Sequence, residues 1–203
     1  MSLIKSVDEL RALYRMPGGR SLEKELTHLE KHSRQFISLS PFLVIGSSSG
    51  DGTADVSPRG EAPGFVKVLD DKRIAIPDRP GNNRLDTLRN LLEKPQVGLI
   101  FLIPGVDETL RINGHAEIRD DDELLEMFAV SGKRPCTVLL VHVEEVYLHC
   151  AKALMRSKLW QAEAMNTRDV LPAMGQMISD QIGAATPPET QQDMQERYRK
   201  VLY

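Results

Sequence analysis

The stretch that most constrains the fold of this chain is residues 41–150, where short apolar segments follow one another without a helix between each pair. Clusters of Gly, Pro and Asp separate the segments, as is typical of turns between strands. Strands do not alternate regularly with helices, and no Gly-rich phosphate-loop motif is present, which disfavours a Rossmann-type parallel sheet. We therefore expect a small barrel of six or seven strands, with apolar segments at 42–45, 65–69, 74–76, 97–103, 110–118 and 138–148.

Helices are expected before, within and after this barrel. Val7, Leu10 and Leu13 recur at helical spacing, and a second helix is expected to begin at the N-cap Ser21, with an apolar stripe of Leu22, Leu26, Leu29 and Phe36. Two helices, near 84–93 and 121–130, interrupt the strands, and 165–182 and 189–203 are predicted to be helical. The chain is thus expected to be one domain over 1–203, with N-terminal helices (1–40), a barrel (41–150) and a C-terminal helical extension (151–203).

Composition narrows the classes of function. The 203 residues carry a net charge of −3 with a pI near 6.0, so no basic surplus is available for binding nucleic acid. No apolar run approaches the roughly 20 residues of a membrane span, and the first 20 residues lack a signal-peptide core. Cys136 and Cys150 form no CxxC pattern and are expected to be reduced, buried side chains. We expect a cytoplasmic protein with no membrane partner.

Two segments have the chemistry to hold a phosphate. Arg59 lies between Pro58 and Gly60, and its planar donor fork suits two phosphate oxygens, with Ser57 as a further hydroxyl donor. The alternative is an exposed Arg in a turn at the end of a strand. The segment 76–87 then places two Arg and two Asn at the start of a helix, where free N–H groups favour an anion. Its alternative is a helix start capped by Asn82, Asn83 or Asp86.

Two further segments combine cations with polar or aromatic side chains. Arg111 and Asn113 are two residues apart in a predicted strand and share one face, which is either solvated or aimed at a ligand. After the last strand, Lys152, Arg156 and the single Trp160 could line a planar anionic ligand, or belong to a helix packed on the barrel. The Met stripe of 165–182 favours core or subunit contact.

No metal site is predicted. His28 and His32 share a helical spacing of four but lack the HExxH pattern of a zinc site. No nucleophile motif is recognisable either, so no catalytic residue can be assigned.

Taken together, these segments resemble the FMN-binding split barrels related to pyridoxamine 5'-phosphate oxidase, over about residues 20–160. The resemblance rests on the order and spacing of 57–60, 78–86, 104–114 and 149–157, and is greatest to a bacterial subgroup of FMN-dependent flavoproteins. It implies an α+β fold with an antiparallel split β-barrel, and a homodimer with FMN at the subunit interface. The implied cofactor-binding residues are Ser57, Arg59, Gly60, Ile76, Pro77, Asp78, Asn82, Asn83, Arg84 and Thr87 for the phosphate and ribityl chain, and Thr109, Arg111, His149, Lys152 and Arg156 for the isoalloxazine ring.

The sequence departs from the true pyridoxamine phosphate oxidases at two places. His149 stands where they have a Trp beside the flavin, and their Arg-rich ending is replaced by further predicted helices. The resemblance therefore implies an FMN-dependent oxidoreductase acting on an unidentified small molecule, and we do not predict vitamin B6 oxidation. The alternative is a non-catalytic carrier or sensor of the same fold that binds flavin, deazaflavin or haem, with His149 as the candidate haem ligand.

Overall fold

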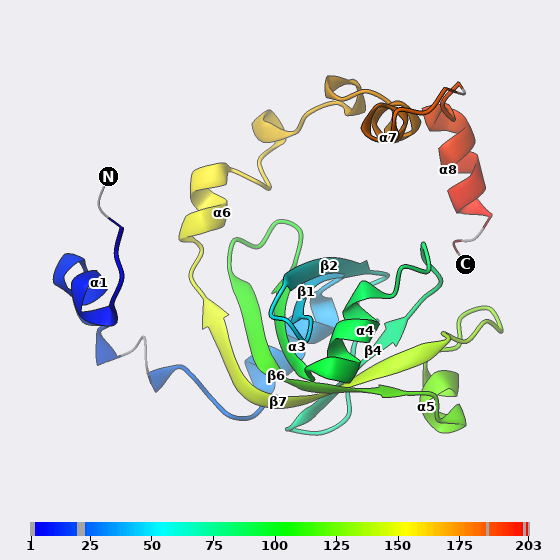
Figure 1. Ribbon diagram of the computed structural model, residues 1–203. Helices are drawn as coiled ribbons and strands as arrows, with labels where there is room; N and C mark the ends of the chain where they lie inside the picture. Colours follow the sequence, from blue (N-terminus) through cyan, green and yellow to red (C-terminus); the bar gives the residue numbers. More distant parts are fainter. Residues whose placement is uncertain (1–2, 20–22, 186, 201, 203) are drawn as a thin grey trace.

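A computed structural model describes residues 3–19, 23–185, 187–200 and 202. Its centre is one antiparallel sheet of seven strands in the order β2-β1-β5-β6-β7-β4-β3, which curls into a split barrel (Figure 1). The split barrel with flanking helices is therefore confirmed. The strands are β1 (Phe42–Ser48), β2 (Ala54–Gly60), β3 (Lys67–Val68), β4 (Arg73–Asp78), β5 (Gln96–Leu102), β6 (Thr109–Arg119) and β7 (Thr137–His149).

The barrel core follows from side chains that alternate between the two faces of each strand. In β1, Leu43 and Ile45 point inward and are fully buried, as is Phe101 of β5. In β6, Leu110 and Ile112 do the same, while Arg111 between them faces outward. Because these side chains meet inside one curled sheet, they form one large core cluster. A smaller second cluster packs Leu125 and Phe128 against Ala75 of β4 and Val138 of β7.

The two longest strands are joined through an irregularity. The register between β6 and β7 shifts between Asn113 and Gly114, where Glu144 is left without a partner across the ladder. A bulge of this kind bends the strand and increases its twist, which lets β6 and β7 wrap around the barrel. The chain passes so closely here that a Cβ on Gly114 would lie 2.0 Å from the carbonyl oxygen of His142.

The helices largely follow the predicted pattern, with two corrections. The helix expected from Ser21 through Phe36 is interrupted, because the chain is not helical over 24–30, where Leu26 forms a β-bridge to Val146. A helix begins at Lys31, and Glu30 caps it by accepting bonds from the N–H groups of His32 and Ser33. Ser21 and Leu22 lie outside the described residues. The helices are α1 (Val7–Leu13), α3 (Lys31–Leu39), α4 (Asp86–Glu93), α5 (Asp122–Met127), α6 (Lys152–Ser157), α7 (Met174–Ile182) and α8 (Gln191–Arg199).

The second correction concerns the helix predicted over 165–182. Only α7, its last nine residues, is an α-helix, and the part before it contains the short 3-10 turns η1 (Ala162–Ala164) and η2 (Arg168–Val170). Pro172 explains the late start, because proline keeps the residue before it out of the helical region. The helix therefore cannot run through Leu171, whose backbone is extended.

The elements at both ends of the chain hardly touch the barrel. None of the described side chains of α1, α6 or α7 is buried, and α8 buries Met194 alone. Figure 1 shows α1 standing apart on one side, while the chain beyond α6 runs in an arc beside the barrel. The indole N–H of Trp160 donates to the carbonyl of Val106 at 2.9 Å, and this bond ties the beginning of the arc to the β5–β6 loop.

The prediction that both cysteines are buried is wrong. Cys136 and Cys150 are free and exposed, because they lie just before and just after β7 instead of within it. Among the described helices, none combines the length and the apolar composition needed to cross a membrane.

Candidate functional site

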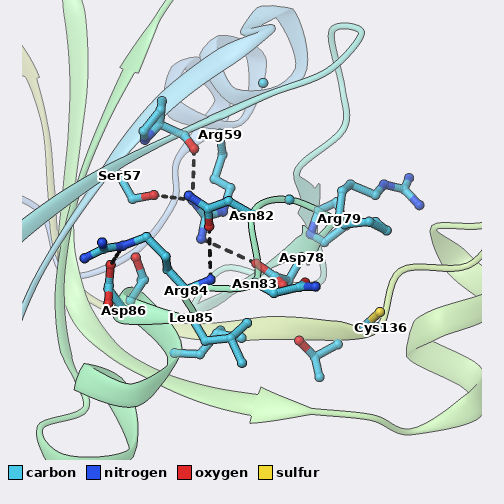
Figure 2. A pocket seen from close by; sticks show the side chains of 18 of the residues that line it. Ser57, Arg59, Asp78, Arg79, Asn82, Asn83, Arg84, Leu85, Asp86 and Cys136 are labelled. Atoms are coloured by element: carbon cyan, nitrogen blue, oxygen red, sulfur yellow. Dashed lines mark hydrogen bonds and ion pairs between the residues drawn. The ribbon is translucent and has the colours of Figure 1, made fainter. Parts of the chain in front are cut away.

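A cavity of about 640 Å³ opens where the barrel is split, between β2 and the end of β4 (Figure 2). The inward face of β2 carries Asp55, Ser57 and Arg59, and all three line this cavity. Their neighbours Val56 and Pro58 point outward and are exposed. The polarity of β2 is therefore the reverse of a core strand, because its inner face is polar and its outer face apolar. We call this space the β2–α4 cavity; segment 79–85 and the first turn of α4 form its other wall.

Arg59 is held firmly in the wall of the cavity. Its guanidinium donates to the hydroxyl of Ser57 at 2.6 Å and to the carbonyl of Pro58 at 2.9 Å. A longer contact of 3.4 Å reaches Asp78, and only 19% of the Arg59 side chain is exposed. The alternative of an exposed Arg in a turn does not describe this residue, which lies within β2 and is held by three oxygens.

Asp78 shares the cavity with Arg59 and has an altered pKa. Burial raises the pKa of its carboxyl group above the ordinary 3.8, and the nearby Arg59 guanidinium opposes that rise only in part. The ion pair is long, so it compensates incompletely for the loss of water around the carboxylate. Asp78 can therefore lose its charge more readily than an exposed aspartate when an anion approaches Arg59.

Replacing Asp78 with Asn is expected to change how stability depends on pH. The folded protein holds this proton more tightly than the unfolded chain, so ionisation of Asp78 lowers the free energy of unfolding as the pH rises from 3.8 through the raised pKa. Without that carboxyl group, the free energy of unfolding of the variant minus that of the wild type should grow with pH and then level off. Urea unfolding of both proteins at a series of pH values measures this; a difference that does not vary with pH would contradict it.

The start of α4 presents its free N–H groups to the cavity. Its N-cap is Leu85, and no side chain in the described part of the chain caps the helix. Asn82 accepts a bond from the N–H of Arg84 at 3.0 Å, which shapes the preceding loop and leaves the helix start open. The sequence-based alternative of a capped helix start is therefore not observed, and the first turn of α4 can still accept an anion.

The loop before α4 has a strained backbone. Asn83 and Leu85 both have φ of 59°, in the left-handed region. Asn tolerates this conformation, but a leucine rarely adopts it, at an expense of roughly 1–3 kcal/mol. Backbone strain of this kind clusters at ligand-binding sites. Thr87, the second residue of α4, is buried, and its hydroxyl lies 3.4 Å from the carboxylate of Asp55.

The other two arginines of the cavity differ in their availability. Arg84 pairs with Asp86 at 2.7 Å, yet 73% of its side chain is exposed, so it can turn toward a ligand. Arg79 forms a two-point ion pair with Glu61, at 2.8 and 3.1 Å, and its side chain extends away from Arg59 and Arg84 in Figure 2. Of the three arginines that line the cavity in the described part of the chain, Arg59 and Arg84 are thus the two that are not held in a two-point ion pair.

Most of the residues predicted around a phosphate surround this cavity. Ile76 is an exception, because its side chain is fully buried in the barrel core. The predicted residues that line the cavity are Ser57, Arg59, Gly60, Pro77, Asp78, Asn82, Asn83, Arg84 and Thr87.

The residues predicted around a ring lie elsewhere. Thr109 pairs with His149 across β6 and β7, and Arg111 lies over the Tyr147 ring at 5.1 Å, on the face of these strands opposite the core. Lys152 and Arg156 follow on α6 and are exposed. We call these five predicted ring residues the β6–α6 group. None of them lines the β2–α4 cavity as the structure describes it, so one chain alone does not bring the two groups together.

Two buried hydroxyls lack a hydrogen-bond partner among the described residues. One is Oγ1 of Thr137, which lines the cavity beside Asp78, its partner in the β4–β7 ladder. The other is Oγ1 of Thr109, in the β6–α6 group. A buried polar group without a partner is destabilising, so both positions favour a polar ligand atom.

Sequence reasoning missed several cavity residues. Asp55 was detectable, because it precedes Ser57 and Arg59 at the two-residue spacing of one strand face. Thr137 and Cys136 line the cavity only because β7 pairs with the end of β4, and no local pattern reveals that pairing. Glu61 was recognisable as a carboxylate, but its pairing with Arg79 depends on the fold.

Comparison with known proteins identifies a family. The family model described as pyridoxamine 5'-phosphate oxidase matches residues 29–150, more than half of the chain, and includes every strand of the barrel. No curated protein sequence is significantly similar to the chain.

Solved structures are similar mainly in fold. A HupZ variant from Group A Streptococcus aligns with a TM-score of 0.50 at 14% identity, over 59% of this chain and 98% of that one. An FMN-binding protein from Syntrophomonas wolfei aligns with a TM-score of 0.45 at 13% sequence identity, over 58% of this chain and 83% of that one. A Clostridium acetobutylicum protein related to general stress protein 26, of the pyridoxinephosphate oxidase family, aligns with a TM-score of 0.43 at 16% sequence identity. The alignment covers 58% of this chain and 85% of that one.

Proposed function

Because this chain belongs to the pyridoxamine 5'-phosphate oxidase family, we propose that it binds FMN between two copies of itself and acts as an FMN-dependent oxidoreductase on a small molecule. The observation that carries the proposal is the joint presence of Arg59 and the uncapped start of α4 in one cavity.

The phosphate of FMN fits the β2–α4 cavity by charge and by hydrogen bonding. A phosphate dianion needs several donors, and the cavity offers Arg59, Arg84 and the free N–H groups of α4. The hydroxyl of Thr137, which has no hydrogen-bond partner in the described part of the chain, adds a donor in the same space. Asp78 opposes the anion, but its raised pKa makes it easier to protonate when the phosphate arrives.

The isoalloxazine ring is assigned to the β6–α6 group of the second copy. None of the β6–α6 group lines the β2–α4 cavity of the described chain, so we assign the two ends of the ligand to different copies, and the proposed assembly is a homodimer. Bound FMN would supply the redox chemistry, and it gains negative charge near N1 when reduced. Arg111, Lys152 and Arg156 would stabilise that charge, while the Thr109 hydroxyl would bond a polar edge of the ring.

The absorption spectrum of the purified protein, with mass spectrometry of the ligand released on denaturation, tests the cofactor. We expect the paired bands of a flavin and the mass of FMN. A Soret band would instead indicate haem, and the mass of a deazaflavin would identify that cofactor; either result contradicts FMN. A colourless protein that cannot be reconstituted with added FMN would end the proposal.

Two further measurements test assembly and turnover. Light scattering of the FMN-bound protein should give the mass of a dimer, and a monomer with FMN bound would contradict a site shared between copies. Reduction of the bound flavin by a chemical reductant, followed by reoxidation in the presence of candidate acceptors, tests the oxidoreductase activity. FMN that stays bound without any turnover would favour the carrier or sensor function.

A further inference from the structure

The chain beyond Trp160 is structured but carries its apolar side chains in the open. We call residues 161–200, from η1 to the end of α8, the C-terminal arm. Its exposed apolar residues include Met165, Val170, Leu171, Met174, Ile178 and Ile182, and Ile182 is 71% exposed. At the other end of the chain, α1 and its flanks expose Val7, Leu13 and Met16 by about the same degree. Isolated exposed apolar residues are common, but a whole segment of them marks a binding surface.

The C-terminal arm has a defined internal structure. Gly175 of α7 lies so close to the segment before α8 that a Cβ would come within 2.2 Å of the Glu189 carbonyl oxygen. Arg168 donates to the carbonyls of Leu171 and Pro172 and to the side chain of Gln191, which joins η2 to α8. These contacts lie within the arm and hold η2, α7 and α8 together without using the barrel. The exposed apolar side of the arm therefore has a defined structure.

The chain exposes more surface than a compact monomer of its mass. The chain exposes 13855 Å², whereas a compact monomer of 22.7 kDa is expected to expose about 9,500 Å². The excess of about 4,300 Å² is several times the roughly 800 Å² that each partner buries in an ordinary stable complex. A small ligand cannot cover such an area, but a second protein chain can.

The position of the arm points to a second copy of this chain as that partner. The arm follows α6, which carries Lys152 and Arg156 of the β6–α6 group, and Leu202 just beyond the arm lines the β2–α4 cavity. The arm of each chain therefore lies beside both groups that the proposed function assigns to one shared ligand. The barrel also has an apolar outer face to be covered, where Val56 of β2 is 72% exposed and Phe42 of β1 is 38% exposed.

We propose that the C-terminal arm of each copy wraps around the barrel of its partner, so that the apolar side of α7 covers the partner's outer β1–β2 face. Each arm would then pack against the other copy's barrel and cover the ligand site that the two copies share. This inference rests on the proposed assembly of two copies, but not on the identity of the ligand between them.

Charge substitutions on α7 test the proposed contact between α7 and the partner's β1–β2 face in the full-length protein. Ile182→Glu and Ile178→Glu each place a carboxylate in the proposed contact, and each should raise the dimer dissociation constant at least about tenfold in sedimentation equilibrium. The matched control is Gln181→Glu, which adds the same charge to an exposed polar position of the same helix. It should change the constant less than about twofold, because a solvent-exposed charge has little effect.

Each outcome supports or contradicts the proposed packing of the C-terminal arm on the partner's barrel. The substituted side chains are exposed in the single chain, so circular dichroism of the monomers should match the wild type. Variants that dimerise like the wild type, or a wild type that stays monomeric or binds lipid vesicles through α7, would overturn the inference. Measurements on protein stripped of ligand separate the two proposals. An arm-dependent dimer of ligand-free protein would support the arm whatever the cofactor is, and a released ligand other than FMN would contradict only the proposed function.

Discussion

Replacing Arg59 with alanine is expected to weaken FMN binding about 10- to 150-fold, the range that corresponds to a charged hydrogen bond of 1.5–3 kcal/mol. Arg59 is a largely buried cation of the β2–α4 cavity that no two-point ion pair holds among the described residues, and Ser57 and the Pro58 carbonyl fix its direction. The substitution also leaves Asp78 without its only ion-pair contact in the described structure, which adds repulsion toward a phosphate. Arg84→Ala should have a smaller effect in the same direction, because Arg84 is mostly exposed and water screens its charge.

Titration of the apoprotein with FMN, followed by quenching of flavin fluorescence, measures this effect. Riboflavin, which lacks the phosphate, provides an internal comparison, and its affinity should be nearly the same for wild type and Arg59→Ala. Arg73→Ala is the matched control, since Arg73 is exposed at the opposite end of β4 and pairs with Asp70. If Arg59→Ala bound FMN as tightly as the wild type, the phosphate would have to bind elsewhere.

Replacing Gly114 with alanine is expected to lower the free energy of unfolding by about 3 kcal/mol or more. The new Cβ would overlap the backbone carbonyl of His142, and a backbone atom in the longest strand pair cannot move aside as a flexible side chain can. The bulge between β6 and β7 would have to open, which disturbs the strands that carry the β6–α6 group. Flavin content should therefore fall together with stability.

Urea unfolding at equilibrium measures the loss, as a lower midpoint with an unchanged slope. Gly46→Ala in β1 is the control, because its Cβ would meet only the Gly98 carbonyl oxygen at 3.6 Å, an ordinary contact. That variant should stay within about 1 kcal/mol of the wild type. A Gly114→Ala protein as stable as the Gly46→Ala protein would show that the bulge can relax.

The barrel was predictable where core and solvent impose a two-residue alternation. β1, β5 and β6 place apolar side chains at every second position, so their apolar segments stand out in the sequence. β2 has no such signal, because Asp55, Ser57 and Arg59 occupy its inner face. Its Arg-containing motif identified it only through resemblance to a family.

The site was predictable in its parts but not in its arrangement. The segment 76–87 indicated an anion site through its composition, but not that Leu85 would adopt a left-handed backbone and leave α4 uncapped. That conformation is imposed by tertiary structure, against the local preference of leucine. Likewise, no local pattern shows that Thr109 and Arg111 lie away from Arg59, since that depends on how many strands separate β6 from β2 in the sheet.

The inverted polarity of β2 would link filling of the β2–α4 cavity to the proposed assembly of two copies. This strand forms one edge of the sheet, and its seven residues are held on one side by β1 alone. Whatever fills the space under Arg59 restrains the same backbone that carries Val56 on its other side. A chain already restrained from one side loses less entropy when a second partner binds, so each event favours the other, and thermodynamic reciprocity makes the two effects equal.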